Sequence, residues 1–286
     1  MSFSIGTGVA NAANPLGLAW KTTQNVELYA KPTGMVVTGR CNAADPKFAA
    51  ARAKGAEVLV YLDPIERPDN YVCAPDAKFF MGDYGRVPLW PYPSYGHRIE
   101  DGGQHLTDMR PGSAWILSVV KYVETLMRER KVDGVFLDVV GGQLWSSNAN
   151  WSSWPMSEKN AWTDGNIDLV RRIDAKRRAI NPFFIVVTNH VWHRREDSRA
   201  VAGEQYVDGV VLEHHAASSA WHRAYAGRKF SNLGQRRVLI IANDTADARA
   251  WAKVPGVTHV SNQGPGQYKY PNVPVIPFNY LGDRED

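Results

Sequence analysis

The sequence predicts an α/β barrel of the TIM type that forms one domain over residues 1–286. Short apolar segments alternate with segments of helical periodicity, which is typical of right-handed βαβ units. Eight apolar segments occur, and eight strands close into a barrel, whereas five or six would form an open sheet. A barrel usually takes roughly 250 residues, so the length of 286 residues suits a single domain. Two domains of about 140 residues are also compatible with the length alone.

The predicted strands are nearly continuous apolar runs, as expected of strands that are buried on both faces of a parallel sheet. The first is the weakest of the eight. No G-x-G-x-x-G follows any of them and no G-x-x-x-x-G-K-[ST] occurs, which argues against an open nucleotide-binding sheet. In chain order the predicted strands are Leu16–Trp20, Met35–Arg40, Glu57–Asp63, Gly134–Val140, Phe183–His190, Gly209–His214, Arg237–Asp244 and Val257–Gln263.

Helices are predicted between these strands. The pattern is clearest in Pro111–Arg130, where Trp115, Ile116, Val119 and Val123 begin a stripe of apolar residues three and four positions apart. Such a stripe is typical of a helix that lies against a sheet. The predicted helices are Pro46–Gly55, Pro111–Arg130, Asp164–Ile180, Ala220–Phe230 and Thr245–Lys253.

Two long insertions, residues 64–110 and 141–163, follow the carboxyl ends of strands, so we expect both over the top of the barrel. Long loops on that face usually shape a substrate groove. Large aromatic rings in polar loops suit sugar binding, because a ring offers an apolar face and a polar edge. Packing of these rings onto the barrel rim is the alternative. The rings concerned are Trp90, Tyr92, Tyr95, Trp145, Trp151 and Trp154.

The composition argues against several classes of partner. The net charge of +4 is small, and the longest basic cluster, within residues 171–178, lies on one predicted helix and is typical of a solvated face. We therefore expect no nucleic-acid partner. No apolar run approaches the roughly 20 residues that span a bilayer, so no membrane insertion is expected. Met1–Ala13 lacks the features of a signal peptide, and a soluble protein is predicted. Cys41 and Cys73 are expected to be free thiols, with one bridge as the alternative.

Polar residues stand at the carboxyl ends of the predicted strands, where barrel enzymes carry their active sites. One polar residue at a strand end is common, but a full set at matched positions favours a binding or catalytic mouth. The residues are Trp20, Arg40, Asp63, Asp138, Asn189 with His190, Glu213, Asp244 and Gln263.

Asp138 and Glu213 are the predicted catalytic pair. Each follows a run of one form, in which Asp-Gly and three apolar residues precede the carboxylate. Two carboxylates at one barrel mouth suit glycoside hydrolysis, in which one protonates the leaving oxygen and the other attacks or stabilises the oxocarbenium ion. Partial burial and mutual repulsion would raise the proton affinity of one of them. The alternative is that one carboxylate pairs with Arg40 or holds a loop.

The remaining strand-end residues, together with Trp145, are predicted to bind substrate. Asp63 would orient a sugar hydroxyl, or else form a turn or cap. Asp244 would bind substrate, or else cap the helix that begins at Thr245. Asn189 and His190 are placed to bind hydroxyl groups.

A metal centre is the main competing chemistry. His190 and His193 are three residues apart and His214 and His215 are adjacent, which would suit a metal-dependent polysaccharide deacetylase or hydrolase. No H-E-x-x-H and no H-x-H in the first strand accompany them, so neither a metal nor another cofactor is expected. A serine nucleophile is disfavoured because no G-x-S-x-G elbow occurs.

The residues 106–115, LTDMRPGSAW, and the two acidic strand ends resemble the endo-α-1,4-polygalactosaminidase-like glycoside hydrolases and related hypothetical glycosyl hydrolases. In that group a D-x-R/T…W segment opens the helix before an acidic G-V-F-L-D strand. The resemblance covers residues 35–263 and implies a TIM barrel that acts on a polysaccharide, with Asp138 and Glu213 as the matching carboxylates. The segment Val139–Gly142 departs from the group, whose members often carry further polar residues there, and this leaves the substrate open.

Some relatives in that group are similar to tail-associated proteins of phages. This resemblance implies a location in a virion tail, other virion tail proteins as partners and action at the bacterial cell surface. The predicted function is a glycoside hydrolase that cleaves a cell-surface or extracellular polysaccharide. A non-catalytic carbohydrate-binding barrel in a virion tail and the metal-dependent deacetylase are the two alternatives.

Overall fold

The structure of the chain is a computed structural model. It describes residues 16–20, 34–39, 43–67, 98–99, 104–144, 151–227, 237–242 and 244–261. Cys41 and Cys73 lie outside these residues. Within them, no helix combines the length and the apolar character needed to cross a membrane.

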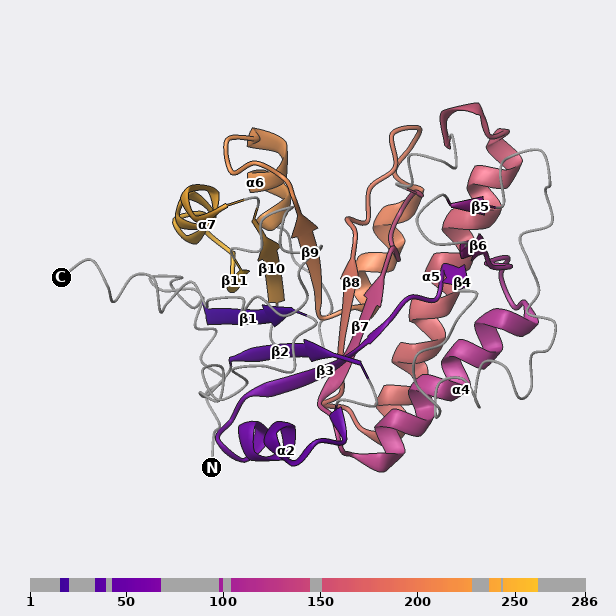
Figure 1. The fold of residues 1–286 in the computed structure, drawn as a ribbon. Coiled ribbons are helices and arrows are strands. Elements are labelled where there is room, and N and C mark those ends of the chain that lie inside the picture. Colours follow the sequence, from indigo (N-terminus) through magenta and orange to yellow (C-terminus); the bar gives the residue numbers. More distant parts are fainter. Residues whose placement is uncertain are drawn as a thin grey trace, which may run out of the picture.

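Eight parallel strands close into a barrel, which confirms the predicted fold class (Figure 1). Each strand pairs with the next one of the barrel in the chain, and the last pairs with the first. All eight predicted strands are present, with ends that are trimmed by up to three residues. The strands are β1 Leu16–Trp20, β2 Met35–Thr38, β3 Glu57–Leu62, β7 Gly134–Asp138, β8 Ile185–Asn189, β9 Gly209–Glu213, β10 Arg237–Ile241 and β11 His259–Ser261.

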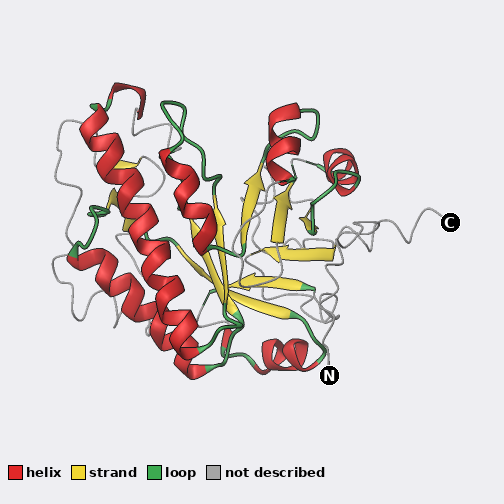
Figure 2. Ribbon diagram, turned by 180° about the vertical axis from the view of Figure 1, so that it is seen from behind, coloured by secondary structure: helices red, strands yellow, loops and turns green. Residues whose placement is uncertain are grey.

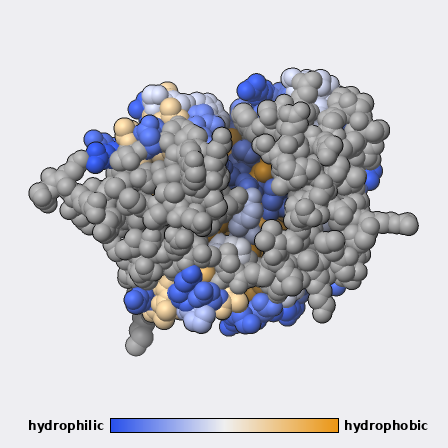
Figure 3. All heavy atoms as spheres, viewed as in Figure 1, coloured by the Kyte–Doolittle hydropathy of each residue, from blue (hydrophilic) through white to orange (hydrophobic). Residues whose placement is uncertain are grey.

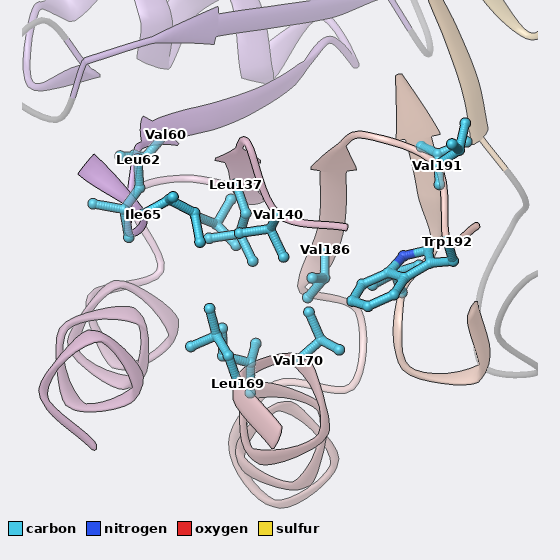
Figure 4. Packing of buried hydrophobic residues seen from close by; sticks show 14 of the residues in the cluster. Val60, Leu62, Ile65, Leu137, Val140, Leu169, Val170, Val186, Val191 and Trp192 are labelled. Carbon is cyan, nitrogen blue, oxygen red and sulfur yellow. The ribbon is translucent and has the colours of Figure 1, made fainter. Parts of the chain in front are cut away.

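Both faces of the barrel strands that follow β1 are buried, which explains why their sequences are continuously apolar. Alternate residues form one cluster inside the barrel, including Leu59, Phe136 and Val211. The residues between them point outward and pack against the helices. Figure 4 shows this outer layer, where Leu137 and Val186 of the strands face Leu169 and Val170 of the helix α5.

Helices surround the strands on the outside of the barrel (Figure 2). Side-chain caps begin several of them, as at Ser113 before α4 and Ser219 before α6. The helices are α2 Pro46–Ala53, α4 Ala114–Glu129, α5 Met156–Ile180, α6 Ala220–Ala226 and α7 Thr245–Ala252, with 3-10 helices η3 Trp151–Ser153 and η4 Arg199–Tyr206.

The predicted start of α5 was wrong by two turns. The helix begins at Met156 instead of Asp164, so it takes up part of the predicted insertion. Its first turns lack an apolar stripe because polar residues are buried there. Lys159 is buried and pairs with Glu196 at 2.8 Å. The 3-10 helix η4, between β8 and β9, was also not predicted.

The other insertion contains a small antiparallel sheet. It consists of β4 Glu66–Arg67, β5 Arg98–Ile99 and β6 Gln104–Leu106, with β6 in the middle. This sheet lies within residues 64–110, which were predicted only as a loop.

The Asp-Gly pairs before β7 and β9 belong to matching clamps at the amino end of the barrel. Asp133 accepts hydrogen bonds from Arg52 Nε and from the N–H of Val58, at 2.9 and 2.8 Å. Asp208 likewise accepts from Arg177 and from the N–H of Val186. Each clamp ties a helix and the start of a strand to the next strand of the barrel.

Gly134 and Gly209 open β7 and β9 inside this end of the barrel. A Cβ atom at Gly134 would lie 2.3 Å from the carbonyl oxygen of Ile185, and one at Gly209 would lie 2.1 Å from that of Arg237. Only glycine fits such a close approach of the backbone. The shared Asp-Gly form is therefore a structural feature of the amino end, while the carboxylates of the same strands stand at the opposite end.

Candidate active site

Asp138, Asn189 and Glu213 are the last residues of three neighbouring strands, β7, β8 and β9. Asp138 and Asn189 are register partners. All three lie at the carboxyl end of the barrel, where the strand ends of such folds form active sites. The structure therefore brings together the two carboxylates that the sequence predicted as a pair.

The side-chain amide of Asn189 joins the two carboxylates. Its Nδ2 atom donates to Oδ1 of Asp138 at 2.7 Å and also to Oε2 of Glu213. Because one nitrogen contacts both oxygens, these oxygens lie no more than about 6 Å apart, or two hydrogen-bond lengths. Asn189 is itself buried, with 2% of its surface exposed, so the bridge is held inside the protein.

Asp138 accepts three hydrogen bonds. Besides Asn189, the hydroxyl of Tyr61 donates to its Oδ2 and the backbone N–H of Val139 donates to its Oδ1 at 3.0 Å. Together the three donors contact both oxygens of the carboxyl group and so fix its orientation.

Tyr61 was not predicted as a site residue. It lies on β3, and its ring stacks on Phe136 inside the barrel at 6.1 Å, so its sequence position is that of a core residue. Burial, followed by the charges of Asp138 and Asp63, raises the pKa of Tyr61 well above its usual value of 10.0. The hydroxyl therefore stays protonated and donates to Asp138. The signal in the sequence was its place two residues before Asp63, on the same face of the strand.

The residues that follow the two carboxylates share a rare backbone conformation. Val139 has φ of 59° and His214 has φ of 56°. This left-handed region is disfavoured for residues other than glycine, most of all for a β-branched one, and costs on the order of 1–3 kcal/mol. The chain thus turns sharply out of β7 and β9 directly after the carboxylates, which leaves both at the barrel mouth.

Three histidines, His190, His214 and His215, lie within two residues of the ends of β8 and β9. His214 Nε2 lies 3.7 Å from Oε1 of Glu213. Burial lowers the pKa of His190 to about 4, although the nearby charge of Asp138 opposes that shift. Burial also lowers the pKa of His215 to about 4. Both imidazoles are therefore neutral at pH 7.

Asp63 and Asp244 make the structural contacts that were weighed as alternatives for them. Asp63 Oδ1 accepts the backbone N–H of Ile65 at 3.0 Å, which closes a turn after β3. Asp244 caps α7 by accepting the N–H of Asp247 at 2.8 Å. Their roles toward a substrate stay predictions.

Several predicted site residues are not described. Arg40, Trp145 and Gln263 lie outside the described residues, and of Trp20 only the backbone at the end of β1 is described. Trp151 and Trp154 are buried, and their ring centres lie 5.3 Å apart. This is the packing arrangement that was the alternative to a sugar-binding role for these rings. In the part of the chain that the structure describes, no group of three or more His, Cys, Asp or Glu residues could hold a metal ion.

In the view of Figure 3, described residues that are mostly hydrophilic are visible near the middle of the molecule, with a hydrophobic one among them.

No family model matches the sequence, and no curated protein matches it either. Solved structures do match. The glycoside hydrolase domain of PelA from Pseudomonas aeruginosa is 12% identical with a TM-score of 0.60, and the match covers 92% of this chain and 98% of that one. Ega3 from Aspergillus fumigatus, in complex with galactosamine, is 14% identical with a TM-score of 0.51, and the match covers 87% of this chain and 84% of that one.

A third match is larger than this chain. The cycloalternan-forming enzyme from Listeria monocytogenes, in complex with a pentasaccharide substrate, is 12% identical with a TM-score of 0.52, and the match covers 96% of this chain and 30% of that one. At these identities the likeness concerns the fold. The chain has the barrel fold that glycoside hydrolase domains use.

Proposed function

We propose that this chain is a glycoside hydrolase that cleaves a cell-surface or extracellular polysaccharide with Asp138 and Glu213. The observation that carries the proposal is the bridge by Asn189, whose one amide nitrogen holds both carboxylates at the barrel mouth. Two carboxyl groups held beside each other at the carboxyl end of a barrel are the arrangement that glycoside hydrolysis needs.

Asp138 is the proposed nucleophile. It accepts hydrogen bonds from Tyr61, Val139 and Asn189, and these fix its orientation. An ionised, oriented carboxylate can attack the anomeric carbon and form a glycosyl-enzyme ester. Water later hydrolyses that ester.

Glu213 is the proposed acid and base. Its carboxylate contacts Asn189 through one oxygen and lies near His214 with the other. In the first step it would protonate the leaving oxygen, and in the second it would deprotonate the attacking water. The short bridge supports retention of configuration, since retaining pairs are about 5–5.5 Å apart and inverting pairs about 6.5–9.5 Å.

The first substrate to test is an α-1,4-linked galactosamine polymer. Two observations lead to it: the resemblance of residues 106–115 to polygalactosaminidase-like enzymes, and the likeness in fold to Ega3, whose structure holds galactosamine. We extend the proposal to residues 1–286 as one domain. A place in a virion tail stays a prediction from the resemblance.

The test measures new reducing ends after the purified protein is incubated with α-1,4-linked galactosamine polymer, its N-acetylated form and a panel of bacterial cell-wall polysaccharides. A hydrolase releases reducing ends from at least one polymer, and NMR of the first product then gives its anomeric configuration. Binding without new reducing ends would indicate the carbohydrate-binding barrel instead. Release of acetate that a chelator abolishes would indicate the deacetylase.

A further inference from the structure

Trp221 is an exposed tryptophan close to the candidate active site. It lies in the first turn of α6 with 42% of its surface exposed. Four other tryptophans, Trp115, Trp162, Trp192 and Trp251, are fully buried, so this fold places its structural tryptophans inside. An exposed indole offers a ligand an apolar face and a polar edge.

The ring of Trp221 packs against a second aromatic ring of the same helix. Tyr225, one turn along α6, stacks on it with ring centres 5.3 Å apart and planes inclined by 22°. Tyr225 is buried, and its hydroxyl donates to Glu204 at 3.1 Å and accepts the N–H of Trp192 at 2.7 Å. The supporting ring is therefore fixed, which reduces the entropy that Trp221 would lose on binding a ligand.

Two histidines flank the tryptophan. The ring of His193 lies 4.9 Å from that of Trp221, inclined by 56°, and the ring of His222 meets it edge-on at 4.9 Å. His222 in turn stacks on His215 at 3.8 Å. Burial lowers the pKa of His215 and that of His222, so these two imidazoles are neutral at pH 7. We call Trp221, Tyr225, His193 and His222 the α6 platform.

The α6 platform is continuous with the catalytic residues. His193 follows Asn189 by four residues, a stretch of chain that spans at most about 14 Å. His215 follows Glu213 by two residues. The segment that leaves the site at Asn189 thus leads to His193 of the platform, and the segment that leaves it at Glu213 leads to His215, which stacks on His222.

From this continuity we propose that the α6 platform is a subsite that stacks one sugar ring of the polysaccharide beside the cleavage point. This inference rests on the proposed function. The apolar C–H face of a pyranose suits the exposed indole face, and Nε2 of His222, whose Nδ1 contacts Oγ of Ser219 at 2.7 Å, suits one of its hydroxyl groups. The platform thereby holds the polymer in register with Asp138 and Glu213.

The test compares Trp221→Ala and Trp221→Phe, each in a Glu213→Gln background that prevents turnover. Phe183→Ala is the matched control, because Phe183 is an aromatic residue with 89% exposure that lies before β8 at the opposite end of the barrel. Calorimetry measures binding of α-1,4-linked galactosamine oligomers, their N-acetylated forms and α-1,4-linked glucose oligomers. We expect Trp221→Ala to bind its best oligomer at least about tenfold more weakly, Trp221→Phe to fall between, and Phe183→Ala to match the parent.

A second measurement uses the wild-type background. The loss in kcat/KM for Trp221→Ala should grow with the length of the oligomer and be absent for a small aryl glycoside that fills only the cleavage point. Equal binding by Trp221→Ala and its parent, or failure of the parent to bind any of the three oligomers, would overturn the platform. Binding that depends on Trp221 without any release of reducing ends would keep the platform and remove the hydrolase proposal.

Discussion

Asp138 and Asn189 are register partners on neighbouring strands, and the amide of Asn189 donates a hydrogen bond to the carboxylate of Asp138 at 2.7 Å. The same amide nitrogen reaches Glu213. One buried side chain therefore sets the separation of the two acids, and the first prediction concerns it.

Replacing Asn189 with leucine should lower kcat/KM by about 100-fold or more, because the charged partners lose an oriented donor that acts on both. The cost in stability should be much smaller. The buried Oδ1 atom of Asn189 has no hydrogen-bond partner among the described residues, and leucine removes this unsatisfied group. Reducing-end kinetics and thermal unfolding check the two effects. If Asn189→Leu lowers the Tm strongly and its activity falls only because the protein unfolds, the bridging role is contradicted.

Asp138→Asn and Glu213→Gln should each lower glycan cleavage by at least about 1000-fold while the fold stays intact. The truncated variants Asp138→Ala and Glu213→Ala separate the two roles when azide is added with an activated glycoside. Azide should replace the nucleophile in Asp138→Ala and give a glycosyl azide of inverted configuration. In Glu213→Ala it should attack the glycosyl enzyme and give the retained configuration. NMR of the products decides, and full activity of either amide variant would refute the role of that residue.

Tyr61→Phe should reduce kcat by about 10- to 100-fold, since a hydrogen bond to a charged group contributes about 1.5–3 kcal/mol. KM should change little, because the hydroxyl contacts Asp138. Tyr206→Phe is the control, as Tyr206 ends η4 at the opposite end of the barrel. Steady-state kinetics of both variants provide the measurement. Equal kcat values for Tyr61→Phe and the wild type would show that this contact does not orient the carboxylate.

His190 should make the protein less stable in acid. Its pKa is about 4 in the folded state, against an ordinary value of 6.5 for histidine, so the unfolded chain binds a proton that the folded chain does not. Stability is therefore complete above about pH 6.5 and falls as the pH drops toward about 4. The Tm of His190→Gln should fall less steeply through this window. Some slope should remain, since the pKa of His215 is lowered to a similar value. Identical slopes in the variant and the wild type would contradict the prediction.

Arg177→Leu should destabilise the fold by about 3–5 kcal/mol. Arg177 is 1% exposed and pairs with Asp174 and Asp208. Burial raises the pKa of Asp208 even beside this arginine. Removing Arg177 therefore leaves the buried carboxyl group of Asp208 without its cation. Arg178→Ala is the matched control. Arg178 pairs with the same Asp174 but is 51% exposed, and its removal should cost less than about 1 kcal/mol. Urea unfolding measures both, and similar losses would contradict the buried clamp.

The eight strands were predictable because burial on both faces leaves a continuous apolar run that few other structures produce. The helix α4 was predictable from its apolar stripe. The first two turns of α5 were not, because buried polar residues such as Lys159 replace the stripe and find their partners on a distant segment. The 3-10 helix η4 also lacked an apolar stripe, since its buried residues are Ala200, Gly203 and Glu204.

The two carboxylates were predictable from their place at strand ends, whereas their surroundings were not. Tyr61 has the pattern of a core residue. Asn189 was predicted to bind a sugar hydroxyl, which stays a prediction, and its bridge between Asp138 and Glu213 was not predicted. Trp151 and Trp154 were weighed as sugar platforms and are buried, while Trp221 was not singled out and is exposed.

The sequence by itself determined which segments form the barrel strands and that polar residues stand near their carboxyl ends, because burial on both faces of a parallel sheet leaves a continuous apolar run. Only the tertiary structure decided how far apart those ends lie and which side chains meet there. Separation across a barrel mouth depends on closure and on the stagger between strands, and these depend on contacts between segments that are dozens of residues apart.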